Sequence, residues 1–570
     1  MSGLATGQAA LAGQHPGGPG GPDTDTDSDA GAADAQGSPG RHRRTQSAAR
    51  APVRERLVPA MPDDGKWGWG GPLLVTAVAA VLRFTGLGSP HVFSFDETYY
   101  AKDALSLLRY GYEQETVTNA NDLILAGNSH VFTGNASYIV HPPVGKWVIA
   151  SGEWVFGATP FGWRFAPAVV GTLVVLMLAR IVRRMTRSTL LGCIAGLLLA
   201  LDGVSIVLSR SALLDGTLTF FVLAAFGSLV IDRDKMRSAM ADWADQRASS
   251  PAQQAAAGTG SKPGPELGPK LGLRPWRLLA GVLIGLACAT KWSGIWFLVA
   301  FGAMTVLWDL GARRAAGVRT PYRAVLTRDA WGAFLSLVPV TFAVYAATWI
   351  PWLATFSQQK RTWYLGRRGP SFLPDNVRAL LDYHSQMLRF HTTLDSPHPY
   401  AAKAIGWLIQ VRPTAFWPIE LKQGQQGCQA ASCTREITSL GTPVLWWGAT
   451  IALIWMVWRW IGARDWRAGA VLGSVAAGWL PWVILYSHRT IFTFYEVAFA
   501  PFMVMALTFA IGAIIGTRDA SPARRTWGAA SAGGYLLLVI ASTAWIWPVL
   551  VGTVLPQADW LRRLWFRGWI

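Results

Sequence analysis

Long apolar runs recur along this chain, and shorter polar or charged connections separate them. A run of about 20 apolar residues is long enough to cross the hydrocarbon core of a bilayer as a helix. We therefore predict an all-α polytopic membrane protein with about eleven membrane-spanning helices. They are expected at residues 71–88, 162–182, 188–208, 211–231, 276–293, 294–309, 331–352, 442–460, 467–487, 495–516 and 528–551.

The connections between these runs differ in charge. Basic residues are concentrated in the connections at 180–187, 232–275, 311–328, 459–466 and 517–525. Acids, aromatic residues and histidines are concentrated on the other side of the eleven-helix topology, at 87–160, 353–441 and 487–494. Because basic loops stay in the cytoplasm, the N-terminus is predicted to be cytoplasmic and the acidic connections extracytoplasmic. The C-terminus then lies outside, and the Trp-rich, amphipathic segment 561–570 is expected on the outer leaflet.

Four regions follow from this pattern. Residues 1–66 are rich in small and polar residues without apolar periodicity, so we expect a disordered cytoplasmic tail. Residues 67–352 form an N-terminal membrane region that carries the site, and a large extracytoplasmic loop follows at 353–441. Residues 442–570 form a C-terminal membrane region with the amphipathic tail. The N-terminal region includes a first outer loop at 87–161 and a flexible cytoplasmic linker at 238–275.

Composition agrees with a membrane protein. Hydrophobic residues make up 51% of the 570 residues and charged residues only 15%, below the roughly 25% that is typical of soluble proteins. The 30 tryptophans suit aromatic belts at the two membrane interfaces. A formal net charge of +18 can indicate nucleic-acid binding. Here the basic residues lie mostly in short loops between spans, so nucleic acid is not expected as a partner.

The chain has 4 cysteines, in two different settings. Cys193 and Cys288 fall in apolar runs and are expected to be buried thiols. Cys428 and Cys433 lie in the large outer loop, where their spacing can close a small disulfide or contribute to a metal site. No CxxC motif or nearby pair of histidines supports zinc, and an extracytoplasmic loop favours the disulfide.

Asp96 and Glu97 stand next to each other in the outer segment SFDETYY (94–100). One interpretation is structural, because Ser94 and Glu97 have the spacing of a capping box at the start of a helix. The other is catalytic, with Asp96 as a general base at the membrane surface. Apolar neighbours would raise its pKa and a nearby arginine would lower it. The sequence leaves both interpretations open.

Several cations are predicted near the outer surface. Arg83 lies late in the first apolar run and Arg164 opens the second. An arginine there either faces the bundle interior or extends to the interface. In HPPVGKW, Lys146 follows His141 and two prolines and is placed near the start of a short amphipathic helix. It can hold a phosphate there as a point charge, or contact lipid headgroups.

The segment SRSALLDGTLTFF (209–221) joins two spans through a very short outer turn. Arg210 and Asp215 are about one helical turn apart in it and can form a pair. Asp202 is predicted near the outer end of the preceding span. Acids inside spans are candidates for functional sites.

Two more outer turns carry charges. Lys291, in KWSG, lies at one of them, and His488, Arg489 and Glu496, in SHRTIFTFYE, lie at the other. Each can be structural. Together they place several charges at one depth, where Lys146, Lys291 or Arg489 can hold an anion.

The large outer loop contains His391 and His398 among aromatic residues and prolines. No HxxxH or HExxH spacing supports a metal site there. We therefore expect a lid or an acceptor groove, and no metal is assigned.

Six segments, taken in order, resemble the protein O-mannosyltransferases, in particular their actinobacterial-type members. They are RFTGLGSPHVFSFDETYYAKDA, HPPVGKW, SRSALLDGTLTFF, KWSG, SPHPYAAKAIGW and HRTIFTFY. The resemblance runs from about residue 80 to the C-terminus and leaves out the first 66 residues and the linker at 238–275.

The resemblance implies a GT-C glycosyltransferase with its site at the outer face of the plasma membrane. The donor would be polyprenyl-phosphate mannose, and the acceptor a Ser or Thr hydroxyl of a translocated protein, with the protein export machinery as a further partner. Asp96 would be the base and Glu97 its acidic neighbour, with Arg83 and Arg164 in the corresponding arginine motifs. A β-linked donor and inversion are implied, and no cofactor is assigned.

This sequence departs from the family pattern at two points. The large loop is too short for the β-trefoil module of eukaryotic relatives, so acceptor selection must differ. Glu496 stands where relatives often have His or Tyr, which leaves the role of that position open.

Two other functions remain as alternatives. A GT-C enzyme that moves a sugar to a lipid or cell-wall glycan would use the same base and phosphate site. A secondary transporter would instead place charges near the bilayer midplane within inverted repeats. We find no internal repeat, and the charges cluster at one face.

Overall fold

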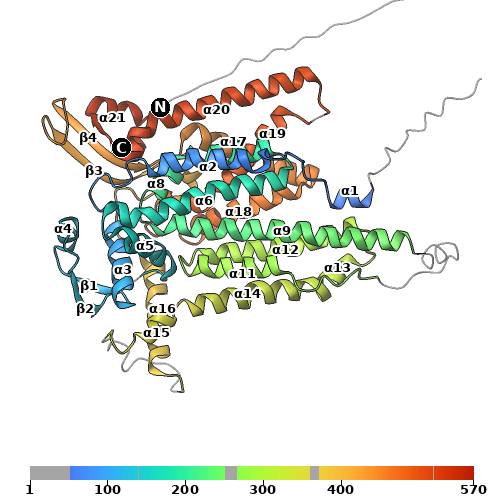
Figure 1. The fold of residues 1–570 in the computed structure, drawn as a ribbon, viewed down its shortest axis with the longest axis horizontal. Helices are drawn as coiled ribbons and strands as arrows, with labels where there is room; N and C mark the ends of the chain where they lie inside the picture. Colours follow the sequence, from blue (N-terminus) through green and yellow to red (C-terminus); the bar gives the residue numbers. More distant parts are fainter. Residues whose placement is uncertain (1–51, 139, 251–265, 360–371, 518) are drawn as a thin grey trace, which may run out of the picture. The chain divides into compact units, whose positions relative to one another are not determined.

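The computed structural model describes residues 52–138, 140–250, 266–359, 372–517 and 519–570. Most of the tail predicted to be disordered, and the centre of the predicted linker, lie outside these residues. Long helices make up most of the described chain and run alongside one another (Figure 1). One apolar core fills this bundle, and a second lies beneath the smaller elements at one end of it.

Within the described residues, 8 helices are long and apolar enough to cross a membrane. One of them is a continuous stretch that runs from α13 (Pro321–Ala324) through the π-helical η1 (Val325–Asp329) and α14 (Ala330–Ala347) to α15 (Ile350–Ala354). The others are α2 (Trp67–Phe84), α6 (Pro160–Thr186), α9 (Leu214–Ala248), α12 (Gly294–Ala315), α17 (Pro443–Ala463), α18 (Trp466–Ile484) and α20 (Pro522–Val551).

The count of about eleven spans is confirmed only in part. Helices α7 (Thr189–Ala200) and α8 (Gly203–Ser209) form a pair bent by 65°, so the span predicted at 188–208 is broken into two helices and counts as a span only if the pair is taken together. The predicted spans at 276–293 and 495–516 contain shorter apolar helices, α11 (Pro275–Cys288) and α19 (Ala500–Ile515). Length and composition support 8 spans, or 9 with the bent pair, in the part of the chain described. The side of the membrane on which each terminus lies stays a prediction.

Local chemistry explains the break between α7 and α8. Asp202 caps α8, because its side chain accepts the backbone N–H of Ser205 at 2.9 Å, and capping residues start helices. Gly203 follows, where a Cβ atom would lie 2.0 Å from the carbonyl oxygen of Leu440. Glycine therefore permits the bent segment to pack against the outer elements.

The smaller elements lie at one end of the bundle (Figure 1). The first outer loop contains α3 (Glu97–Tyr110), β1 (Gln114–Thr116), α4 (Ala120–Leu125), β2 (Phe132–Ala136) and α5 (Val144–Phe156). The large loop contains α16 (Asp375–Thr393), η2 (Ala404–Ile409), β3 (Thr414–Lys422) and β4 (Ser432–Ser439). Next come η3 (Thr493–Ala498), β5 (Val554–Pro556), α21 (Gln557–Arg563) and η4 (Arg567–Trp569).

Two small sheets correct the all-α prediction. Strands β1 and β2 pair antiparallel, and β3, β4 and β5 form an antiparallel sheet in that order. The all-α prediction rested on the apolar runs of the spans. Those runs contain no information about strands in the polar loops between them. The hairpin of β3 and β4 packs Phe416 and Ile437 into the second core.

The ends of the chain also differ from expectation. Helix α1 (Val53–Leu57) lies within the segment predicted to be a disordered tail. Helix α9 continues to Ala248 and so reaches into the predicted linker. Near the C-terminus, Trp560 and Trp569 are buried against the protein, so the tail packs partly on the protein as well as exposing Trp565 and Phe566.

Candidate active site

A cavity of about 1080 Å³ lies beside the outer elements. Its walls come from α3, β1, α5, α9, α11, α12, α14, α16 and α18 and from the segment before α19. Charged and polar side chains from six segments meet in it: Asp96, Tyr100, Asp103, His141, Lys146, Asp215, Lys291, His391, Arg489 and Tyr495. The cavity therefore collects residues from distant parts of the sequence.

One side of this cavity is apolar. Ile295 of α12 and Val338 and Phe342 of α14 line it. The same residues are 44%, 38% and 71% exposed, respectively. The cavity is thus continuous with the apolar outer surface of α12 and α14. An amphiphilic molecule can place a polar head in the cavity and an apolar chain along this surface.

Asp96 precedes α3 and lines the cavity. Burial raises the pKa of Asp96 to about 6, although the Lys291 cation and a hydrogen bond with Tyr100 lower it. A carboxyl with such a pKa is largely ionised at neutral pH and is a better base than an ordinary aspartate. Its position is therefore suited to accepting a proton.

The backbone beside Asp96 is unusual. Phe95 has a φ of 49°, a left-handed conformation that aromatic residues seldom adopt. Its N–H donates to the carbonyl oxygen of Phe416 at 3.1 Å, and the two rings stack with centroids 4.9 Å apart. The β3 strand thus holds a strained turn that aims Asp96 at the cavity.

Glu97 adjoins Asp96 in the sequence but does not line the cavity. Its oxygens accept two hydrogen bonds from the Arg164 guanidinium at 2.8 Å, and both side chains are buried. Its carboxylate also accepts the N–H groups of Ser94 and Ala212, at 2.9 and 3.0 Å. Burial alone would raise the pKa of Glu97, but the Arg164 cation and these hydrogen bonds lower it.

The capping interpretation therefore holds in part. Glu97 accepts the N–H of Ser94, as in a capping box, but the N-cap residue is Asp96. The Ser94 hydroxyl has no hydrogen-bond partner among the described residues.

Lys291 and Asp215 form an ion pair, and both charges act on the pKa of Asp96: the Lys291 cation lowers it and the Asp215 carboxylate raises it. The Lys291 ammonium lies 2.9 Å from both Asp215 oxygens and 4.7 Å from the centre of the Tyr495 ring. The pair considered between Arg210 and Asp215 is therefore wrong. Arg210 instead donates to backbone carbonyl groups at the end of α2 and just beyond it.

Lys146 lies in the first turn of the helix predicted for it, α5, and is only 1% exposed. Its ammonium lies 3.0 Å from Asp103 and 3.2 Å from Glu113. Burial disfavours the charged form, but these carboxylates raise the pKa of Lys146 overall. Two acids already surround this cation, so it is a poorer phosphate site than the sequence suggested.

Asp103 and Glu113 were missed at the sequence level. Asp96, Tyr100 and Asp103 have spacings of four and seven residues, which place them on one face of a helix. That spacing is the signal that would have identified Asp103.

Arg489 has a different environment. It lines the cavity, and its guanidinium has no carboxylate partner within the described ranges. Its Nε atom is buried without a hydrogen-bond partner there. The guanidinium lies 5.9 Å from the centre of the Trp482 ring. Arg489 therefore offers donors to an anion in the cavity.

A pair of histidines adjoins Arg489. The rings of His141 and His391 stack with centroids 5.0 Å apart, and His391 Nε2 lies 2.5 Å from the carbonyl oxygen of Val140. Burial, and then nearby cations, lower the pKa of His141 well below its usual value. Burial also lowers the pKa of His391 to about 4. Both rings are therefore neutral at physiological pH.

The arginines of the first two apolar runs, Arg83 and Arg164, do not line the cavity. Arg83 is buried in the bundle and donates to the Ser205 and Ser209 hydroxyl oxygens at 3.0 and 3.2 Å. Arg164 binds Glu97 and backbone carbonyl groups of the preceding loop. Both arginines face the protein interior and fasten α8 or the Asp96 turn in place.

Glu496 joins a buried polar network. Its Oε1 atom accepts the Gln410 amide N–H at 2.6 Å. The backbone carbonyl oxygen of Gln410 in turn accepts the Trp569 indole N–H at 2.6 Å. The adjacent Tyr495 lines the cavity, so this network connects the C-terminal segment to the site.

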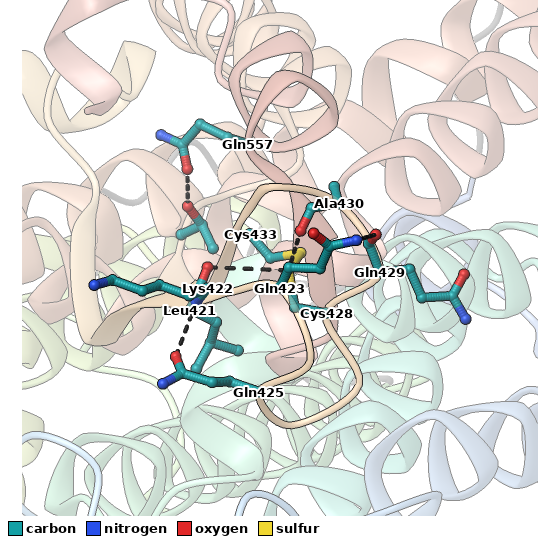
Figure 2. Close-up of a disulfide and its surroundings, with 10 residues drawn as sticks. Leu421, Lys422, Gln423, Gln425, Cys428, Gln429, Ala430, Cys433 and Gln557 are labelled. Atoms are coloured by element: carbon teal, nitrogen blue, oxygen red, sulfur yellow. Dashed lines mark hydrogen bonds between the residues drawn. A yellow bond between two sulfur atoms is a disulfide. The ribbon is translucent and has the colours of Figure 1, made fainter.

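Cys428 and Cys433 form a disulfide at the turn of the β3–β4 hairpin, with the sulfur atoms 2.01 Å apart (Figure 2). Cys288 is buried and Cys193 is half-buried. Within the described ranges, no group of three or more His, Cys, Asp or Glu residues could hold a metal ion. That no metal takes part stays a prediction.

Comparison with family models gives two matches. Residues 73–243 match the model described as dolichyl-phosphate-mannose-protein mannosyltransferase. Residues 376–569 match the C-terminal four-transmembrane region of protein O-mannosyltransferases. The first match includes the Asp96 turn, and the second includes Arg489.

Similar proteins cover nearly the whole chain. A polyprenol-phosphate-mannose–protein mannosyltransferase of Mycolicibacterium smegmatis is 40% identical over 89% of this chain and 94% of its own length. One of Mycobacterium tuberculosis is 39% identical over 90% of this chain and 94% of its own length. The Saccharomyces cerevisiae Pmt1–Pmt2 complex, solved with its sugar donor, has a chain that superposes with a TM-score of 0.65 at 13% identity. This match covers 91% of the present chain and 94% of the yeast chain. The chain therefore belongs to the protein O-mannosyltransferase family of membrane glycosyltransferases.

Proposed function

We propose that this protein transfers mannose from polyprenyl-phosphate mannose to Ser or Thr hydroxyl groups of translocated proteins, at the outer face of the plasma membrane. Asp96 carries the proposal, because its carboxylate lies in the cavity with a pKa raised to about 6 by burial. A protein hydroxyl is a weak nucleophile at neutral pH, so a positioned base is what such a transfer requires.

The reaction proceeds as a single displacement with inversion. The acceptor oxygen attacks C1 of mannose while the bond from C1 to the phosphate oxygen breaks. Asp96 takes the hydroxyl proton, and polyprenyl phosphate leaves as an anion. Since the leaving group is already a stabilised anion, no acid is needed to protonate it.

Arg489 holds the phosphate of the donor in this mechanism. Its guanidinium faces the cavity without a carboxylate partner among the described residues, and arginine binds phosphate through paired hydrogen bonds. Lys291 is bound to Asp215 and adds positive charge near Asp96. The Arg489 cation favours the transition state, in which negative charge develops on the phosphate.

The apolar side of the cavity accommodates the lipid of the donor. Ile295, Val338 and Phe342 join the cavity to the membrane-facing surface of α12 and α14. Helix α12 lines the cavity with its first residues, and the arginine-rich segment 311–328 begins in its last turn and continues beyond it, at the far end of the helix from the cavity. The positive-inside rule then supports an extracytoplasmic cavity.

A transfer assay tests the proposal. Membranes that contain the wild type or Asp96→Asn, at matched expression, are incubated with labelled polyprenyl-phosphate mannose and a Ser/Thr-Pro-rich peptide. We expect at least about a hundredfold loss of peptide labelling in the variant, since a general base contributes roughly 10²–10⁴-fold.

Asp122→Asn is the matched control. Asp122 lies in α4 and does not line the cavity, so its substitution should leave labelling unchanged. Near-normal turnover of Asp96→Asn would refute the base assignment. Label on lipid or glycan but none on peptide would instead identify a different acceptor class.

A further inference from the structure

A second pocket lies outside the active-site cavity. It has a volume of about 380 Å³ and is lined by the loop after α2, the turn of the β3–β4 hairpin, and the end of α20 with the residues that follow. We call it the interface pocket. Its lining residues are Thr85, Gly86, Ser89, Arg210, Gln426, Arg435, Trp547, Val551, Gly552, Thr553 and Val554. Two of them are arginines, and none is an acid.

Arg210 contributes a charge that no carboxylate balances within the described ranges. The side chain is 8% exposed. Its Nη1 atom donates to the carbonyl oxygens of Arg83 and Thr85 at 2.9 and 2.7 Å, and Nη2 donates to that of Gly86 at 3.3 Å. These acceptors are neutral, so the positive charge remains on the wall of the pocket.

Arg435 has the same kind of surroundings. Its Nε atom donates to the Gly552 carbonyl oxygen at 2.8 Å, and the two Nη atoms donate to Gln426 Oε1 at 3.1 Å and Ser89 Oγ at 3.2 Å. The guanidinium also lies 5.4 Å from the centre of the Trp417 ring. All of these partners are uncharged, and each holds the guanidinium in place.

Two fixed guanidinium groups on one pocket, with no acid in its lining, favour an anion. Positioned arginines bind phosphate and carboxylate groups, because their donor geometry matches two of the oxygens of either group. The Ser89 and Thr85 hydroxyl groups lie in the same lining. We infer that the interface pocket binds a phosphate group, separately from the donor phosphate in the active-site cavity.

The surroundings favour a phospholipid as the source of this phosphate. Trp547 lines the pocket, and tryptophans at helix ends mark the headgroup level of a membrane. The flanking helices expose apolar residues, including Val81 of α2 and Leu538 of α20 at 64% and 60%. An anionic headgroup in the pocket would leave its acyl chains beside these helices.

Native mass spectrometry of the purified full-length protein tests the inference. The protein is titrated with phosphatidylglycerol and, in parallel, with phosphatidylcholine. Arg435→Gln removes one charge from the pocket, and each basic residue near a membrane surface contributes about 1 kcal/mol towards anionic lipids. We therefore expect phosphatidylglycerol affinity to fall by about fivefold or more, and Arg435→Lys to retain most of it.

Arg412→Gln is the matched control. Arg412 also donates to backbone carbonyl groups, those of Pro399 and Gly568, and lies 5.4 Å from the centre of an aromatic ring, that of Tyr400, but it does not line the pocket. Gln426→Glu is a second pocket variant, which keeps Arg435 and adds a carboxylate of the same size beside it. It should weaken phosphatidylglycerol binding as Arg435→Gln does, and it keeps the test decisive if that variant fails to fold.

The source of the phosphate is distinguished by competition with inorganic phosphate at constant ionic strength. Competition that Arg435→Gln abolishes supports the site with free phosphate as a sufficient ligand. Selective phosphatidylglycerol binding without such competition supports the site with a lipid as its ligand. Equal phosphatidylglycerol affinity in wild type, Arg435→Gln and Gln426→Glu would overturn the inference.

Discussion

Replacing Glu97 with glutamine separates the roles of the two adjacent acids. The substitution keeps the size of the side chain and removes its negative charge. The native carboxylate binds the Arg164 guanidinium at 2.8 Å and accepts the N–H groups of Ser94 and Ala212. In the variant, an amide NH₂ group would take the place of one acceptor oxygen and face these donors.

The cost follows from burial. Glu97 is 0% exposed and Arg164 is 2% exposed, so the substitution leaves a buried cation without its counter-ion. Removing one partner of a buried ion pair costs about 3–5 kcal/mol. Arg164 keeps its hydrogen bonds to the carbonyl groups of Leu87, Pro90 and Val92. We therefore expect the lower end of this range, a free energy of unfolding reduced by about 3 kcal/mol.

Thermal unfolding of the purified protein in detergent is the assay, combined with transfer measured well below the unfolding temperature. The expected result is a clear fall in unfolding temperature for Glu97→Gln. The double variant with Arg164→Gln should lose less stability than the two single variants together, because the buried charge is then gone as well.

One result would refute this assignment. A Glu97→Gln protein that unfolds like the wild type, yet has lost transfer activity, would mean that Glu97 takes part in the chemistry. The structural role would then belong to Arg164 and its carbonyl contacts alone.

Three further predictions concern the base, the hairpin and the C-terminus. Because burial raises the pKa of Asp96 to about 6, the free base is lost as pH falls through that value. A pH profile of kcat/KM should therefore decline about tenfold per unit below pH 6, and a flat profile would contradict the assignment. Replacing Cys428 and Cys433 by serine removes a disulfide that joins residues with a sequence separation of 5. The β3–β4 hairpin should then be less stable by about 2 kcal/mol, as measured by its sensitivity to proteolysis. Transfer activity should be retained. Trp569→Ala removes a buried side chain and the hydrogen bond to Gln410, which should lower the free energy of unfolding by about 3–5 kcal/mol. If the unfolding temperature and the protease resistance of the C-terminal segment are both unchanged, Trp569 does not anchor that segment.

The same raised pKa affects stability. A carboxyl whose pKa is higher in the folded protein than in the unfolded chain stabilises the fold at low pH, and that contribution is lost as pH rises through the folded value. The shift from 3.8 to about 6 corresponds to a cost on the order of 2–3 kcal/mol at neutral pH. Asp96→Asn should therefore unfold no earlier than the wild type, unlike Glu97→Gln.

Most helices of the bundle could be predicted from the sequence, because an apolar run long enough to span a membrane has few structures available to it other than a helix. The short helix α5 and the positions of the outer turns also follow the predicted pattern. The break at Asp202 did not, since it depends on capping and on the close approach of Gly203 to Leu440. The contact between Gly203 and Leu440 joins residues that are distant in the sequence. The apolar periodicity of a single segment cannot predict such a contact.

The candidate site was predictable in its residue types and less so in its pairings. Asp96, Lys291 and Arg489 all reach the cavity. Asp96 lines the cavity whereas Glu97 binds Arg164, and the turn that separates their surroundings includes Phe95, whose left-handed backbone is held by Phe416. A sequence pattern cannot show that two adjacent acids diverge in this way.

The exposed apolar wall formed by α12 and α14 has a consequence for kinetics. A substrate that enters the cavity from within the bilayer is concentrated in two dimensions, so its saturation depends on its mole fraction among the surrounding lipids. Adding inert phospholipid at constant total donor should slow the enzyme by surface dilution, whereas adding buffer at a constant lipid ratio should not. Michaelis constants for the donor would then be comparable between preparations only when expressed in mole per cent.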